Sequence, residues 1–160
     1  MTIAVGDTIP DINIATMGES GPQPISTADF FAGKKVVLFS VPGAFTPTCS
    51  AKHLPGFIEN AQAFFDKGVD TIACMSVNDA FVMGAWGKSQ SADDKVVMLA
   101  DGNGDFSKAM GLEMDASGFG MGLRGKRFSM IVNDGKVEAL NVEDPGAFHV
   151  SSAEHTLSQL

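Results

Sequence analysis

The sequence predicts an α/β fold in which helices flank a central mixed β-sheet. Three observations support this prediction: strand-like runs alternate with helix-like segments, a hairpin signal lies in the C-terminal part, and no long polar linker, repeat or low-complexity tract interrupts the order. A chain of 160 residues can bury one core of ordinary size. We therefore expect a single domain over residues 1–160.

The first half of the chain is typical of a βαβ unit. Lys35–Val41 is an apolar, β-branched run without glycine or proline, the pattern of a strand buried on both faces. Apolar residues from Leu54 to Phe65 recur at helical spacing, and Gly68 is expected to end that helix. Val69–Val77 then predicts a second, mostly buried strand.

The middle of the chain continues this alternation. Asn78 or Asp79 can cap a helix that runs to about Lys88. A third strand is predicted over Val96–Leu99, and Asp105 is expected to cap a short helical turn after it.

The C-terminal part predicts a hairpin followed by a helix. Arg127–Val132 and Lys136–Val142 are predicted strands that flank the turn signal Asn133–Gly135, while Ser151 and Glu154 form a capping box for the final helix. The resulting order, βαβ and then ββα, matches a thioredoxin-like sheet that is antiparallel on one side and covered by helices on both faces. Active residues are expected beyond the carboxyl ends of the parallel strands.

Charge and composition exclude several classes of partner. The formal net charge of −8 and the pI near 4.6 argue against nucleic acid and against an anionic membrane. The two cysteines form neither a disulfide framework nor a C-x-x-C zinc-ligand pair, which favours a reducing compartment. Met1–Ala4 lacks the basic start of a signal peptide, and no segment approaches the ~20 apolar residues that span a bilayer. We expect a soluble, cytoplasmic protein.

Cys49 lies where a buried strand gives way to a helix, a position that suits a nucleophile. Near the first turn of a helix, unpaired amide N–H groups and the positive end of the dipole favour the thiolate over the thiol. Pro42 and Pro47 stiffen the connecting loop, and Gly43 allows its backbone to come close to a ligand. The alternative is a small buried residue that fills a gap at the helix start.

The segment from Pro42 to Cys49, PGAFTPTC, resembles the active-site signature of the peroxiredoxins. The similarity extends from about Val5 to the C-terminus and implies a thioredoxin-like fold, a thiol peroxidase activity and a homodimer. Further motifs are similar to those of the type II, or atypical, branch of this superfamily: His53-Leu54-Pro55-Gly56-Phe57, Ser76-Val77-Asn78-Asp79, Ala85-Trp86, Gly122-Leu123-Arg124 and Ser151-Ser152-Ala153-Glu154.

The resemblance implies roles for three side chains. Cys49 would attack a peroxide oxygen and become a sulfenic acid. Thr46 would donate from its hydroxyl to the sulfur or to the bound peroxide; by sequence alone it is equally an N-cap or loop residue. Arg124 matches the family's site arginine and would favour the thiolate and hold the peroxide, whereas without the resemblance it is more simply a surface arginine.

A substrate pocket is expected from Pro42, Gly43, Ala44 and Phe45. Backbone amides around Ala44 and Cys49 would donate to the peroxide, and Pro42 would shield it from water. The chemistry requires no metal, haem or flavin, so we expect no cofactor. An apolar cluster is expected around the site, either as core or as part of a dimer face: Phe45, Phe81, Met83 and Trp86.

Two further residues, His53 and Cys74, each have a catalytic and a structural interpretation. His53 lies on the same side of the helix as Cys49, but no hydrolase signature surrounds the pair, so we expect capping or packing rather than a catalytic base. Cys74 is a resolving thiol in some members of the family. Strand geometry places its Cα on the order of 10 Å below the active-site rim, whereas a disulfide needs Cα atoms within about 7 Å. We therefore favour a structural Cys74.

The sequence thus predicts a thiol-dependent peroxidase for hydrogen peroxide and small organic hydroperoxides, recycled by glutathione and glutaredoxin or by thioredoxin. One alternative is a disulfide oxidoreductase, which the lack of a C-x-x-C motif disfavours. The other is a peroxide-sensing switch or chaperone-like binding protein, in which Cys49 is oxidised without rapid turnover.

Overall fold

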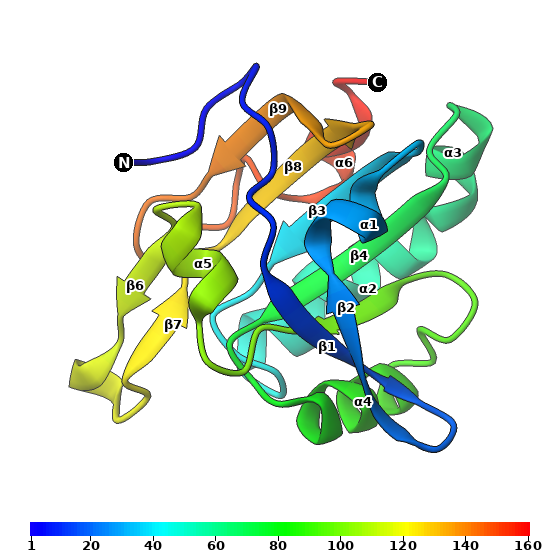
Figure 1. Ribbon diagram of the computed structural model, residues 1–160. Coiled ribbons are helices and arrows are strands. Elements are labelled where there is room, and N and C mark those ends of the chain that lie inside the picture. The colour runs from blue at the N-terminus through cyan, green and yellow to red at the C-terminus, as the bar shows by residue number, and fades with distance from the viewer.

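The computed structural model describes residues 1–160 and contains two sheets (Figure 1). The larger sheet has seven strands in the order β2-β1-β5-β4-β3-β8-β9, and the smaller pairs β6 with β7. The strands are β1 (Asn13–Gly18), β2 (Gly21–Ser26), β3 (Lys35–Ser40), β4 (Thr71–Ser76), β5 (Val97–Ala100), β6 (Glu113–Asp115), β7 (Leu123–Gly125), β8 (Phe128–Asn133) and β9 (Lys136–Val142).

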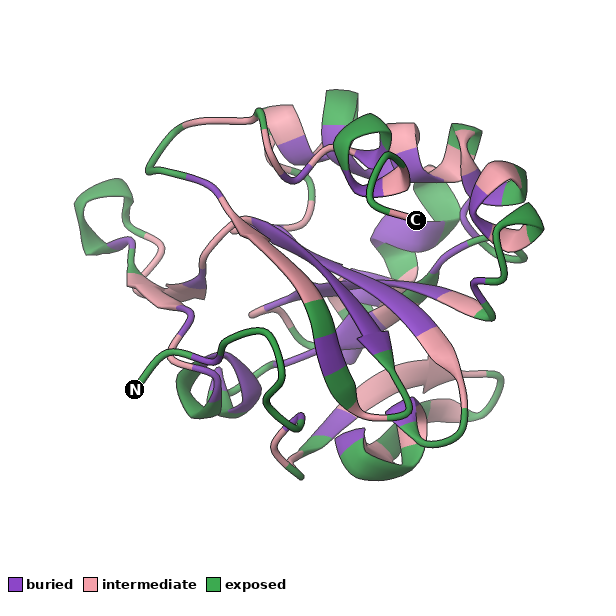
Figure 2. Ribbon diagram, turned by 90° about the horizontal axis from the view of Figure 1, so that it is seen from above, coloured by how far each residue is buried: buried purple, intermediate pink, exposed green.

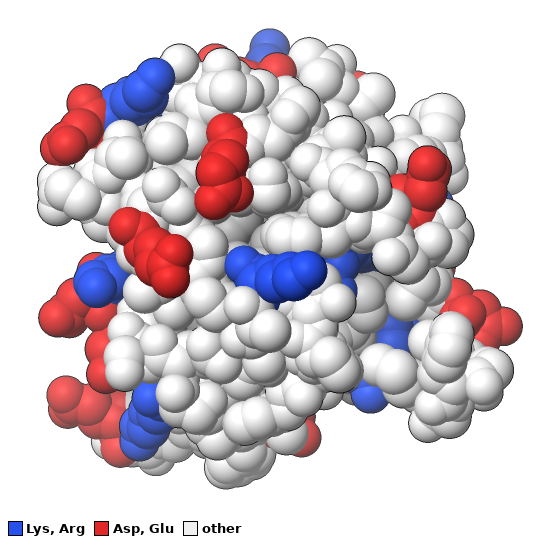
Figure 3. Space-filling view, turned by 180° about the vertical axis from the view of Figure 1, so that it is seen from behind, with Lys and Arg blue, Asp and Glu red and all other residues white.

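The helices lie in two layers on opposite faces of the larger sheet. They are α1 (Thr27–Phe31), α2 (Leu54–Glu59), α3 (Ala61–Asp66), α4 (Ala80–Ser89), α5 (Asp105–Ala109) and α6 (Ala153–Leu157), with a π-helical turn at Cys49–His53 and a 3₁₀ turn at Ser117–Phe119. No helix is long and apolar enough to cross a lipid bilayer. On the face shown in Figure 3, Lys and Arg are dispersed among Asp and Glu rather than gathered into one basic surface.

The central strand β3 faces two hydrophobic cores, as its unbroken apolar sequence predicts. Val37 and Phe39 point to the core under α2, α3, α4 and α6, whereas Val36 and Leu38 point to the core under α1 and α5. Buried residues therefore follow the central strands between the two helical layers (Figure 2). Phe39 stacks on Phe57 of α2 with a centroid separation of 4.0 Å, which ties β3 to the helix that follows the site.

The predicted strands and the C-terminal hairpin are confirmed. β3, β4 and β5 form parallel pairs, and β8 pairs antiparallel with β3 and with β9. Asp134 and Gly135 both have positive φ angles, 48° and 77°, which a type I′ hairpin turn requires.

The sheet differs from the prediction at the edge opposite β8 and β9. There β1 is antiparallel to β5 and also pairs with β2. The sheet is therefore antiparallel on both sides. The prolines Pro22 and Pro24 made this hairpin hard to detect from sequence. They are tolerated because β2 is an edge strand that needs hydrogen bonds on one side only.

The predicted helix after Cys49 is divided into three short segments. Leu54 N–H donates to the Cys49 carbonyl, the spacing of a π-helix, and Pro55 supplies no amide donor to a regular ladder at this point. Asn60 separates α2 from α3 and donates from its side chain to the Gly56 carbonyl. The apolar spacing was predicted correctly, but the backbone around the cysteine is wider than an α-helix.

Two of the three predicted helix caps are wrong. Asp79 caps α4 by accepting from the Val82 amide, as expected. The cap of α5 is not Asp105, because Asp101 accepts from the amides of Phe106 and Ser107. The final helix is capped by Ser152, which accepts from the His155 amide.

Phe64 and Phe119 provide a matched test of the core. Phe64 is fully buried and stacks on Phe57, whereas Phe119 is 85% exposed. Phe64→Ala is expected to lower the free energy of unfolding by about 3–5 kcal/mol, because it leaves a cavity. Phe119→Ala should change it by less than about 0.5 kcal/mol. Urea denaturation measures both, and equal losses would contradict the assigned core.

Candidate active site

Cys49 begins the π-helical turn that follows the loop after β3, and its side chain is fully buried. The loop is attached to the neighbouring strand through Asn78, whose Oδ1 accepts from the Ala44 amide at 3.0 Å and from Ser76 Oγ at 2.6 Å. The Ala44 amide, which we expected to donate to the peroxide, is therefore already used. Asn78 instead holds the loop at the carboxyl end of the parallel strands.

The loop packs closely around Gly43. A Cβ atom there would lie 3.1 Å from Arg124 Nη1, Met121 Cε and Thr46 Cγ2, so these side chains would have to shift by a few tenths of an ångström. Glycine thus allows the loop to approach protein atoms closely in this structure. Phe45, two residues later, has a positive φ of 63° and is 56% exposed, so this part of the expected pocket faces outward.

Thr46 is half-buried in the same loop, and its hydroxyl donates to the Gly43 carbonyl at 2.6 Å. The single hydroxyl proton is therefore engaged within the loop, and the expected donation to the sulfur or peroxide does not occur in this arrangement. The lone pairs of Thr46 Oγ1 can still accept a hydrogen bond. The hydroxyl is accordingly placed to act as an acceptor.

Arg127 is the arginine at the sulfur. Its Nη2 donates to Cys49 Sγ at 3.2 Å. Arg124, which the resemblance indicated, instead donates through Nε to the Met121 carbonyl at 3.1 Å and through Nη1 to the Pro42 carbonyl at 3.3 Å. Our assignment of the site arginine to Arg124 is thus wrong by three positions: Arg124 connects β7 to the loop, and Arg127 contacts the thiol.

The register of β8 against β3 explains why Arg127 lies near the Cys49 loop. β8 pairs antiparallel with β3 so that Phe128 lies opposite Ser40. The residue before Phe128 must then lie next to the start of the loop that carries Cys49. The sequence predicts both strands but not their mutual register. It therefore indicates that Arg127 lies at the start of a strand, but not that Arg127 reaches the sulfur.

His53 links Arg127 to the C-terminal part of the chain. Arg127 Nη1 lies 2.8 Å from His53 Nδ1, and His53 Nε2 lies 2.9 Å from the Ser151 carbonyl oxygen. A guanidinium can only donate and a carbonyl can only accept. The ring must therefore be neutral, with its proton on Nε2 and its lone pair on Nδ1.

The surroundings of His53 agree with this neutral form. Burial lowers the pKa of His53 to about 3, and the positive charge of Arg127 acts in the same direction; the Ser151 carbonyl and Glu143 partly oppose them. Three aromatic rings surround the imidazole, with centroid distances of 4.9 Å to Phe39, 5.7 Å to Phe57 and 4.9 Å to Phe148. His53 is thus more than the capping or packing residue that we expected, because it orients Arg127.

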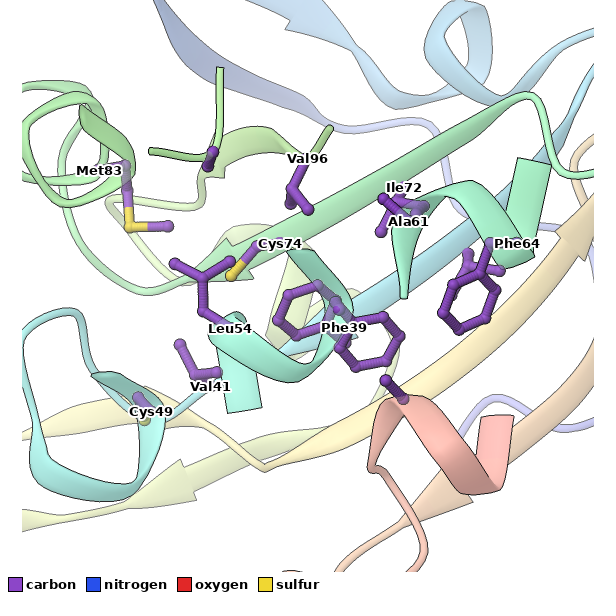
Figure 4. Packing of buried hydrophobic residues seen from close by; sticks show 14 of the residues in the cluster. Phe39, Val41, Cys49, Leu54, Ala61, Phe64, Ile72, Cys74, Met83 and Val96 are labelled. Carbon is purple, nitrogen blue, oxygen red and sulfur yellow. The ribbon is translucent and has the colours of Figure 1, made fainter. Parts of the chain in front are cut away.

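Cys74 occupies a different environment from Cys49, although both thiols are free. It lies on β4 opposite Phe39 and is fully buried. Burial raises its pKa well above the usual range for a thiol, and Cys49 adds to this effect while Arg127 opposes it. In Figure 4 the side chains of Leu54 and Val41 lie between the two cysteines.

A cavity of about 440 Å³ is lined by Arg127, the residue that contacts the Cys49 sulfur. Pro42 and Thr48 also line it, and Met114, Phe119 and Met121 contribute apolar surface. The cavity is large enough for a small organic molecule. Pro42 therefore lies where a pocket residue was expected, whereas Gly43, Ala44 and Phe45 do not line this cavity.

The low pKa of His53 has a consequence for stability. A histidine that titrates near pH 6.5 when unfolded and near pH 3 when folded stabilises the protein fully above pH 6.5. This contribution is lost as the pH falls toward 3, because the unfolded chain then binds the additional proton. Between pH 7 and pH 4 the loss amounts to about 3 kcal/mol at 1.36 kcal/mol per pH unit.

Urea denaturation of the wild type and of His53→Gln at pH 7 and pH 4 separates the contribution of His53 from that of the titrating carboxylates. The difference in free energy of unfolding between the two proteins should shift by about 3 kcal/mol against the wild type on acidification. A difference that is the same at pH 7 and pH 4 would rule out a neutral, buried His53.

Comparison with known proteins identifies the family. The family model described as Redoxin matches residues 4–157. The chain is 51% identical to Peroxiredoxin-2B of Arabidopsis thaliana, covering 99% of this chain and 98% of the relative. It is also 51% identical to the chloroplastic Peroxiredoxin-2E-2 of Oryza sativa subsp. japonica, covering 99% of this chain and 73% of the relative.

A solved structure supports the same relationship. Reduced Prx3 of Vibrio vulnificus, crystallised in complex with H2O2, superimposes with a TM-score of 0.95 at 53% identity, covering 99% of both chains. The fold, the position of the thiol and these similarities agree. The chain therefore belongs to the redoxin family and, within it, to the type II peroxiredoxins, which are thiol-dependent peroxidases.

Proposed function

We propose that Cys49 is the nucleophile of this peroxidase, acting on hydrogen peroxide and small organic hydroperoxides, and that Arg127 is its electrostatic partner. The observation that carries the proposal is the 3.2 Å hydrogen bond from Arg127 Nη2 to Cys49 Sγ. A fixed guanidinium beside the sulfur favours the thiolate, the form that reacts. The cavity that Arg127 lines offers space for a peroxide next to the same guanidinium.

The reaction balances with these groups alone. The Cys49 thiolate attacks one peroxide oxygen, an S–O bond forms and the O–O bond breaks, which leaves a sulfenic acid. The second oxygen departs as hydroxide or alkoxide and takes a proton from water. The remaining N–H groups of Arg127 can stabilise charge on that oxygen. The Thr46 hydroxyl, whose proton is held by the Gly43 carbonyl, would accept the O–H of the substrate.

An external thiol completes the cycle in this proposal, either glutathione with glutaredoxin or thioredoxin. The support comes from Cys74, the only other cysteine, which is fully buried with a raised pKa. A thiol in that state is a poor nucleophile toward a sulfenic acid. Cys74 is therefore assigned a structural role in the core.

A homodimer and a cytoplasmic location are also part of the proposal. Two large apolar side chains are exposed here: Phe81 on α4 is 65% exposed, and Phe45, whose ring lies 6.5 Å from that of Trp86 on α4, is 56% exposed. A second copy of the chain would cover them. Both cysteines are free, the state that a reducing compartment maintains. Sedimentation and fractionation of cells would measure the oligomeric state and the location.

Stopped-flow oxidation of the reduced protein tests the site. Cys49→Ser should abolish the reaction with hydrogen peroxide. Arg127→Lys should lower the second-order rate constant by about 100-fold, because lysine lacks the rigid fork whose two nitrogens reach the sulfur and His53 separately. Arg124→Lys is the matched control and should lower it by less than about tenfold.

Two results would contradict the assignment. A larger loss in Arg124→Lys than in Arg127→Lys would move the electrostatic role back to Arg124. A wild-type protein that reacts no faster than a free thiol would favour the redox switch or binding protein over an enzyme.

Cys74→Ser tests the recycling step. The variant is expected to keep the rapid first oxidation and full turnover with glutathione and glutaredoxin, because a buried, protonated thiol takes no part in either step. Consumption of NADPH through glutathione reductase follows the turnover. If turnover disappears while the first oxidation remains, Cys74 is the resolving thiol.

A further inference from the structure

The loop between β9 and α6, residues 143–151, contains none of the residues assigned to the chemistry, yet it contacts Arg127 and the His53 ring that orients Arg127. We refer to it as the closing loop. Its Ser151 carbonyl accepts from His53 Nε2 at 2.9 Å. Its Phe148 ring lies 4.9 Å from the His53 ring and 5.7 Å from Arg127 Cζ. The loop therefore contacts both the imidazole and the guanidinium.

Glu143 holds this loop in place. A single carboxylate oxygen, Oε2, accepts from the His149 amide at 2.7 Å, the Ser151 amide at 2.8 Å and Ser151 Oγ at 2.7 Å. The side chain is only 8% exposed, and no Lys or Arg pairs with it; the one salt bridge in the structure joins Lys35 and Glu138. Three donors therefore stabilise a nearly buried carboxylate without a counterion.

The Glu143 carboxyl stays ionised because of these donors. Burial by itself would raise its pKa, but hydrogen bonds from the Ser151 side chain and from the amides of Ser151, His149 and Val150 outweigh burial and hold the pKa below the usual range. The backbone of Glu143 is fixed as well, since its amide donates to the Arg127 carbonyl at 3.0 Å. One residue thus ties the backbone of Arg127 to the end of the closing loop.

We propose that Glu143 is a positioning residue for the peroxidase reaction, which acts by holding the closing loop so that Ser151 and Phe148 orient His53 and Arg127 toward Cys49. The proposal rests on the roles given above to Cys49 and Arg127. The path has three hydrogen-bonded steps: Glu143 fixes Ser151, the Ser151 carbonyl fixes the His53 ring, and His53 Nδ1 fixes the guanidinium that donates to the sulfur.

The physical basis is geometric. With the Ser151 carbonyl removed, the His53 ring is free to rotate or to place its proton on Nδ1, and that proton would face the Arg127 guanidinium. Arg127 would then leave its position at the sulfur. A displacement of about 1 Å at a reacting centre can lower a rate by about 100-fold.

Three variants test the proposal in the reduced full-length protein. Glu143→Ala removes the acceptor and should lower the rate constant with hydrogen peroxide by about 10–100-fold at pH 7. Glu143→Gln keeps an oxygen that can still accept from two of these donors and should stay within about threefold of the wild type. Glu138→Ala, the matched control, removes an exposed carboxylate from the adjoining strand β9 and should leave the rate unchanged.

The pH dependence of the rate separates positioning from a general loss of structure. The charged and titratable groups around Cys49 are Arg127 and His53 on one side, Cys74 in the core and Arg124 near Gly43. With Arg127 displaced, the thiolate loses its donor, so the midpoint of the rate profile should move to higher pH in Glu143→Ala but not in Glu143→Gln or Glu138→Ala. Trp86 fluorescence can follow the reaction, because its indole N–H donates to Ser50 beside Cys49.

Each outcome decides the matter. A slower Glu143→Ala with a shifted midpoint, together with a nearly normal Glu143→Gln, supports the proposal. An unchanged midpoint and rate in Glu143→Ala overturns the positioning role of Glu143. If Arg127→Lys still reacts slowly in that case, the proposed function is unaffected. If Arg127→Lys is also unaffected, the proposed function itself fails.

Ser151→Ala covers the case in which Glu143→Ala does not fold. This variant removes one of the three donors to Glu143 but keeps the backbone carbonyl that contacts His53. It should lower the rate by a smaller factor and shift the midpoint in the same direction. A folded Ser151→Ala protein with the wild-type rate and midpoint would overturn the proposal.

Discussion

The fork of Arg127 between Cys49 and His53 is the interaction on which the rest of the site depends. One guanidinium nitrogen donates to the sulfur and the other to the imidazole, so the arginine cannot move without losing both contacts. Two donors in a rigid plane give a direction as well as a charge. The antiparallel register of β3 and β8 brings this side chain to the loop that carries the cysteine.

The desolvation of polar and charged groups in this site explains why so many hydrogen bonds surround it. A guanidinium in a largely buried site loses hydration, and any polar group left unpaired there would carry the full penalty. Asn78 pairs the loop amide of Ala44, Thr46 pairs the Gly43 carbonyl, and Glu143 collects the amides of the closing loop. These bonds make the loop rigid, and a rigid loop keeps the sulfur within hydrogen-bonding distance of its donor.

The two cysteines show that environment, rather than residue type, determines thiol chemistry. Both belong to the same hydrophobic cluster and both are fully buried. Cys49 has a guanidinium within hydrogen-bonding distance, and that guanidinium belongs to a residue that lines a cavity, whereas Cys74 is enclosed by apolar side chains of the sheet and helices. Burial without a donor favours the protonated thiol, so only one of the two sulfurs is suited to nucleophilic attack.

Local patterns in the sequence determined much of this molecule. The apolar run of Lys35–Val41, the Asn133–Gly135 turn and the placement of Cys49 at a strand-to-helix junction all depend on neighbours in the chain, and the structure agrees with each. The tertiary structure decided which arginine reaches the sulfur and what His53 contacts. These contacts join residues 74 to 98 positions apart, and they follow from strand register and loop closure. Spacing along the chain carries no information about either, because both are set only when the sheet and its loops have packed.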